Sequence, residues 1–81
     1  MSMFDISDYR RAAALIQHHG AGSLDGMNAV VDEANEADRT THLLYSLLAI
    51  YQEIVPELRT DLGMSLMSSY IYKLAGAEQS E

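Results

Sequence analysis

The stretch 43–58, LLYSLLAIYQEIVPEL, decides the expected fold because it combines a long apolar helix pattern with a proline near its end. On a helix at 100° per residue its apolar side chains share one face. Leu43 and Ile50 widen that face to roughly 160°, against the ~100° of an ordinary surface helix. One neighbouring helix does not cover so wide a face. The sequence therefore predicts a central helix that begins near residues 38–41 and runs to about Val55.

Pro56 sets the end of this helix. Proline lacks the backbone N–H donor, clashes with the preceding turn, and pushes the residue before it away from helical geometry. The helix therefore either ends at Pro56 or kinks there and continues to Arg59. Because Leu58 keeps the helical phase, the kink is the favoured outcome.

Three further helices flank the central one, and each has apolar residues at helical spacing. We place the first at about 8–19 and the second at 24–37. The last begins between 60 and 64 and ends near 75. Asp5 or Ser7 can cap the first and Ser23 the second, because their side chains accept hydrogen bonds from free N–H groups.

Glycines and short turns complete the expected architecture. Gly20 and Gly76 suit the residue that follows a helix end. No segment alternates with the period of a strand, and short turns make sequential helices antiparallel. We predict an all-α fold, a compact antiparallel bundle of about four helices, as a single domain over 1–76 with a flexible acidic tail at 77–81.

Charge and composition narrow the possible functions. The chain of 81 residues has twelve acidic and five basic side chains and a net charge of −7, which repels nucleic-acid phosphates and anionic membranes and favours basic protein partners. The N-terminus lacks a signal-peptide pattern, and the apolar stretch 43–55 is too short to span a bilayer. We therefore expect a cytoplasmic location, with no direct contact to nucleic acid or membrane.

An acidic face is the first candidate binding surface. Asp32, Glu33 and Glu36 lie on the polar side of the helix at 24–37, which carries no basic residue. Such a face either keeps the protein soluble or docks a basic partner. If it imitates nucleic acid, the protein is a decoy for a nucleic-acid-binding protein.

Apolar and tyrosine side chains of the two C-terminal helices form the second candidate surface. Small domains often gain stability by oligomerising, and methionine adapts to imperfect packing. Tyrosine is enriched at interfaces. We predict a homodimer through the two C-terminal helices. Its partner-binding residues are Tyr45, Tyr72, Leu43, Ile50, Met64 and Met67.

Catalysis and cofactor binding have little support in the sequence. The chain has no cysteine, and its glycine-rich segment 20–26 follows a helix rather than the strand of a dinucleotide site. Glu53 and Glu57 lie on a polar helix face, whereas paired catalytic carboxylates need an apolar or enclosed pocket. Asp38 and His42 have i, i+4 spacing and could share a metal, but two ligands do not make a site. We expect no catalytic residue, no cofactor and no bound metal.

Two segments also carry a resemblance. DRxxHLLYSLLAIY (38–51) followed by VPELRTDLG (55–63) resembles short uncharacterised α-helical proteins of actinobacteria and their phages, over about 24–76. The resemblance implies an accessory role in a host or phage cell and no catalytic residue. Overall, the sequence predicts a protein-interaction or regulatory module. The alternatives are an acidic decoy and a metal-binding protein that uses Asp38 and His42.

Overall fold

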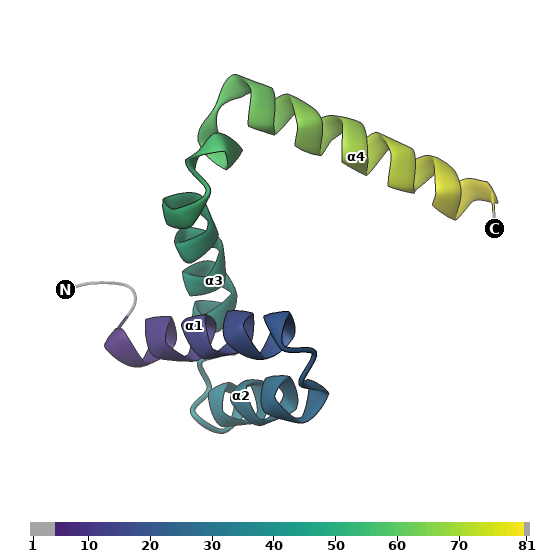
Figure 1. Ribbon diagram of the computed structural model, residues 1–81. Coiled ribbons are helices and arrows are strands. Elements are labelled where there is room, and N and C mark those ends of the chain that lie inside the picture. The colour runs from purple at the N-terminus through teal and green to yellow at the C-terminus, as the bar shows by residue number, and fades with distance from the viewer. Residues whose placement is uncertain (1–4, 81) are drawn as a thin grey trace. The chain divides into compact units, whose positions relative to one another are not determined.

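The computed structural model describes residues 5–80, and this part of the chain contains helices and no strand (Figure 1). The α-helices are α1 (Ile6–Gly20), α2 (Leu24–Glu36), α3 (Thr40–Ile54) and α4 (Asp61–Ser80), with a 3₁₀ turn, η1 (Pro56–Arg59), before α4. The all-α, four-helix prediction is confirmed. Residues 1–4 and 81, which the sequence assigns to the domain and to the tail, lie outside the described residues.

The chain divides into two compact units, Met1–Ile50 and Tyr51–Glu81, and each is described by itself. The first unit holds α1, α2 and most of α3. The second holds the end of α3, η1 and α4. The single domain over 1–76 stays a prediction.

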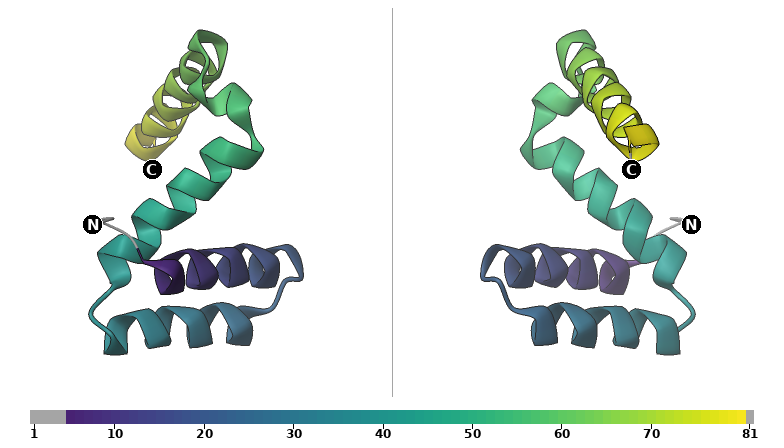
Figure 2. Two further views of the ribbon diagram at one scale, coloured as in Figure 1. Left: turned by 90° about the vertical axis from the view of Figure 1, so that its left-hand side faces the viewer. Right: turned by 90° about the vertical axis from the view of Figure 1, so that its right-hand side faces the viewer.

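Side-chain caps define the helical hairpin of the first unit. The carboxylate of Asp5 accepts from the N–H of Asp8 at 3.2 Å, and the carboxylate of Asp8 accepts from the N–H of Asp5 at 3.0 Å. This reciprocal capping box starts α1, and Ser23 caps α2 as predicted. The left-handed residue between the helices is Gly22, with φ +70°, rather than Gly20. α1 and α2 lie side by side and run in opposite directions (Figures 1 and 2).

The core of the first unit is small and has one contribution from each helix. Ala12 of α1 and Ala34 of α2 are fully buried, and Leu43 of α3 is 2% exposed. Alanine lets the two helices approach closely, and Leu43 fills the remaining space. Partly buried side chains that pack against this cluster are Leu15, Val31, Leu47 and Ile50.

At Pro56 the helix ends, so the favoured kink is wrong. Val55 has φ −121° and ψ 75°, outside helical geometry, as the residue before a proline prefers. The chain continues as η1, in which the N–H of Leu58 bonds to the carbonyl of Val55 at 3.1 Å. The helical phase of Leu58 therefore reflects a new turn and not a continued α3.

α4 begins where the sequence predicts and extends beyond the predicted end. The Thr60 hydroxyl accepts from the N–H of Gly63 at 3.1 Å and donates to the Glu57 carbonyl at 2.7 Å, which caps the helix and ties it to η1. The predicted end near 75 is wrong, because the helix continues through Gly76 to Ser80. α4 therefore includes residues 77–80. The flexibility of this segment stays a prediction.

Candidate interaction surface

A buried ion pair fastens the three helices of the first unit together. Asp8 is fully buried, and its two carboxylate oxygens accept from Arg39, from Nε at 3.1 Å and from Nη2 at 2.5 Å. Arg39 lies in the turn before α3, where its N–H bonds to the Ala34 carbonyl at 2.8 Å. The two parallel hydrogen bonds fix the guanidinium in one orientation. This pair, the Asp8–Arg39 clamp, joins the first turn of α1 to the connection between α2 and α3.

A second set of ion pairs changes the predicted acidic face. Oε1 of Glu33 accepts from Arg10 Nη2 at 2.5 Å and from Arg11 Nε at 2.9 Å. The helix itself carries no basic residue, as predicted, and both arginines come from α1. Asp32 and Glu36 remain exposed on α2. Of the three acids predicted to dock a partner, Glu33 is therefore already engaged in contacts within the chain.

Both paired carboxyl groups are held in their ionised form. Hydrogen bonds from Arg39 lower the pKa of Asp8 to about 2, although burial opposes that shift. The same contact raises the pKa of Arg39. Hydrogen bonds from Arg10 and Arg11 lower the pKa of Glu33. A carboxylate that stays charged near neutral pH is a poor proton donor, so these groups suit a structural role better than acid–base catalysis.

The clamp makes stability depend on pH. Because the pKa of Asp8 lies lower in the folded chain than its ordinary value of 3.8, the clamp contributes fully above about pH 4 and is lost as the pH falls towards 2. Glu33 acts in the same direction. We expect the midpoint of thermal unfolding, followed by circular dichroism, to fall over this range. Asp8→Asn should weaken that dependence, and equal slopes for both proteins would contradict the assignment.

The second unit exposes a continuous apolar helix face. Seven large side chains of α4 are each between 46% and 70% exposed. We call them the α4 face: Leu62, Met64, Leu66, Met67, Tyr70, Ile71 and Leu74. From Leu62 to Ala77 the only charged residue is Lys73. An apolar face of this kind is stable in water when another surface covers it.

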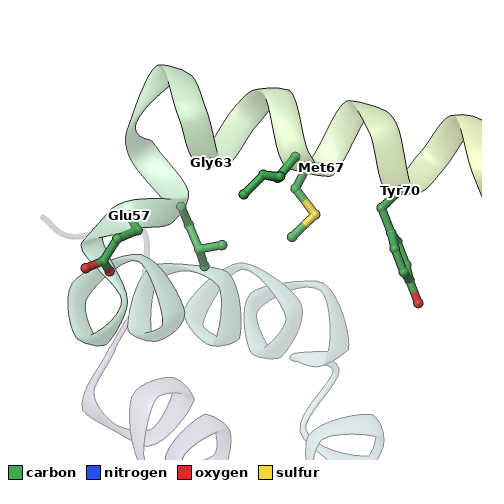
Figure 3. A pocket seen from close by; sticks show the side chains of 6 residues that line it. Glu57, Gly63, Met67 and Tyr70 are labelled. Carbon is green, nitrogen blue, oxygen red and sulfur yellow. The ribbon is translucent and has the colours of Figure 1, made fainter.

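A groove runs along part of the α4 face, beside η1. It encloses about 400 Å³, and its lining residues are Glu57, Leu58, Gly63, Leu66, Met67 and Tyr70. The four from α4 recur at i, i+3, i+4 and i+7, one side of a helix. Figure 3 shows Met67 and Tyr70 projecting from the same side of α4, with Glu57 near its beginning. The groove is apolar, and Glu57 borders one end of it with its carboxylate directed away from Met67 and Tyr70 (Figure 3).

Gly63 allows η1 to pack against α4. A Cβ atom at this position would lie 1.9 Å from the carbonyl oxygen of Glu57, far inside van der Waals contact. The conflicting atom belongs to the backbone, so a change of side-chain rotamer cannot relieve the clash. The shape of the groove therefore depends on the missing side chain of Gly63.

The predicted apolar binding residues fall into two environments. Met64 and Met67 lie on the α4 face. Tyr72 is 84% exposed on the opposite side of α4, and Tyr45 is half exposed on α3. Leu43 belongs to the buried core and Ile50 packs against it, so those two side chains are already covered within the first unit.

The spacing argument for a metal at Asp38 and His42 does not hold. Asp38 lies before α3 with φ +58°, so the two residues do not share a helix face. Within residues 5–80 no three histidine, cysteine or acidic side chains gather as metal ligands would. Glu53 and Glu57 are likewise on separate elements, α3 and η1, and both are exposed.

Sequence reasoning missed most of the groove. Of its lining residues only Met67 is among the predicted binding residues. The helical spacing of residues 63–70 places Leu66 and Tyr70 on the apolar face of their helix, but it does not say whether that face is buried or free to bind a partner. No sequence signal brings the Glu57 carbonyl against Gly63, because that contact depends on the path of the chain after Pro56.

Comparison of the chain with protein-family models, curated proteins and solved structures finds no match. None of the helices in the described part of the chain has the length and apolar content needed to cross a membrane.

Proposed function

We propose that this chain is a small cytoplasmic protein-binding module without catalytic activity of its own, and that the α4 face is its docking surface. The observation that carries the proposal is the exposure of seven large apolar side chains on one 20-residue helix. Water contact with such side chains is unfavourable by about 25 cal/mol per Å² of apolar surface. A second polypeptide that covers them recovers this free energy.

The size of the α4 face fits a specific protein interface. From their exposed fractions, its seven side chains present on the order of 800 Å² to solvent, similar to the roughly 800 Å² that each partner buries in an interface of standard size. The helical spacing of the groove residues suits an amphipathic helix laid along it, a common mode of peptide recognition. The expected partner is therefore a helix with an apolar face.

The two alternative functions have weaker support. An acidic decoy needs acids that remain available to a basic groove, and Glu33 is paired with Arg10 and Arg11. A metal-binding protein needs Asp38 and His42 on a common face, and Asp38 lies outside α3. An apolar docking surface needs only exposed side chains of the kind that α4 presents.

Site-specific photo-crosslinking in the producing cell tests this proposal. A photoreactive phenylalanine analogue at Met67 reports on the α4 face, and the same analogue at Ser65 reports on the opposite side of the helix. We expect crosslinks to another polypeptide chain, a second copy or a different protein, from position 67 and few from position 65. Equal yields from the two positions, or crosslinks only within one chain, would contradict the proposal.

A further inference from the structure

We infer that the α4 face is covered by a second copy of this chain, whose α4 runs antiparallel to the first. The inference rests on the proposed function and names the partner. Residues 1–50 hold seven acidic and three basic side chains, whereas Lys73 is the one charge between Leu62 and Ala77. Two copies of an acidic chain repel each other over most of their surfaces. The α4 face is a large exposed apolar surface on which they approach without juxtaposing carboxylates.

The direction of pairing follows from where the charges lie along the segment. Glu57, Arg59 and Asp61 lie just before Leu62 and have a net charge of −1, and Lys73 lies twelve residues beyond Asp61. Parallel pairing would put the two net-negative ends together and lysine against lysine. Antiparallel pairing puts the lysine of each copy beside the net-negative end of the other, and it also opposes the two helix dipoles favourably. Because the pair is symmetric, each favourable contact occurs twice.

We place the two-fold axis at the midpoint of the groove. Its α4 residues run from Gly63 to Tyr70, so its midpoint lies between Leu66 and Met67. Lys73 lies about 10 Å further along the helix at 1.5 Å per residue. In the antiparallel pair, Lys73 of the second copy therefore lies beside η1 and the first turn of α4, where Glu57 lines the groove. By helical phase Lys73 is at the edge of the α4 face, next to Leu62 and Leu66, so its ammonium group reaches the rim while the apolar side chains pack.

Charge reversal in the full-length chain tests this arrangement. We expect Lys73→Glu and Glu57→Lys each to weaken self-association about tenfold in sedimentation equilibrium, because either change makes two attractive contacts repulsive. An equimolar mixture of the two variants should recover the affinity of the unmodified chain, because every Glu57–Lys73 contact then joins opposite charges. Both residues are exposed, so the fold should persist, and circular dichroism verifies it. Ser65→Glu, on the opposite side of α4, is the matched control with little expected effect.

Two results would overturn the inference. The unmodified chain could sediment as a monomer at high micromolar concentration, or the mixture could associate no better than each variant alone. If position 67 then crosslinks to a different protein, the second copy is the wrong partner and the proposed docking surface stands. If position 67 crosslinks to no other chain, both proposals fail.

Discussion

Asp8→Ala is expected to lower the unfolding midpoint of the first unit by on the order of 10 °C or more, because it leaves the guanidinium of Arg39 without its bidentate partner. The carboxylate is fully buried and links α1 to the turn before α3. Its loss also removes half of the capping box with Asp5. Thermal unfolding of the full chain, followed by circular dichroism, measures the effect.

Asp32→Ala is the matched control for this substitution. It removes the same side chain from an exposed position on α2, where surface changes have small effects. We expect its midpoint to stay close to that of the unmodified chain. A similar loss in both variants would mean that Asp8 contributes only its negative charge, and the clamp would not be what holds the three helices together.

Gly63→Ala is expected to separate η1 from the beginning of α4. The added Cβ would meet the Glu57 carbonyl at 1.9 Å, so the turn must move away and the groove must change shape. The hydrogen bonds that join Thr60 to Glu57 and Gly63 are then lost or lengthened. We expect amide hydrogen exchange over 58–64 to accelerate at least tenfold and self-association to weaken with it.

Gly76→Ala makes the same chemical change on the same helix without a steric conflict. Beyond the neighbouring helix backbone, no described atom lies within 4 Å of the place that a Cβ would take at Gly76. Alanine also favours a helix interior over glycine by about 0.8–1 kcal/mol. This variant should therefore stabilise α4 slightly and leave the groove intact. If the two alanine variants behave alike, the groove does not depend on Gly63.

Local chemistry made much of the fold predictable. Asp5 and Ser23 have the side chains that cap helices, and both cap helices here. Pro56 marks a real boundary, although the continued phase of Leu58 favoured the wrong outcome there. Gly76 gave a wrong predicted end for the last helix, because glycine permits a helix to end without requiring it to do so. Each of these correct and incorrect predictions concerns interactions between residues that are close in the sequence.

The site was less predictable because its contacts join distant residues. Asp8 and Arg39 are 31 residues apart, and Arg11 and Glu33 are 22 apart. Helical phase assigns a residue to a face of its own helix, but it does not say which other helix lies beside that face. The wide apolar pattern at 43–58 drew attention to α3, whose Leu43 is buried but whose Leu44, Leu48 and Ile54 are exposed. α4 exposes seven further large apolar side chains.

The molar mass of the unmodified chain in solution tests the central claim most directly. Light scattering coupled to size-exclusion chromatography measures that mass independently of molecular shape. We expect a species of about 18 kDa, twice the 9.0 kDa of one chain, with dissociation only on dilution. A clean 9.0 kDa monomer at high micromolar concentration would contradict the claim that a second copy covers the α4 face.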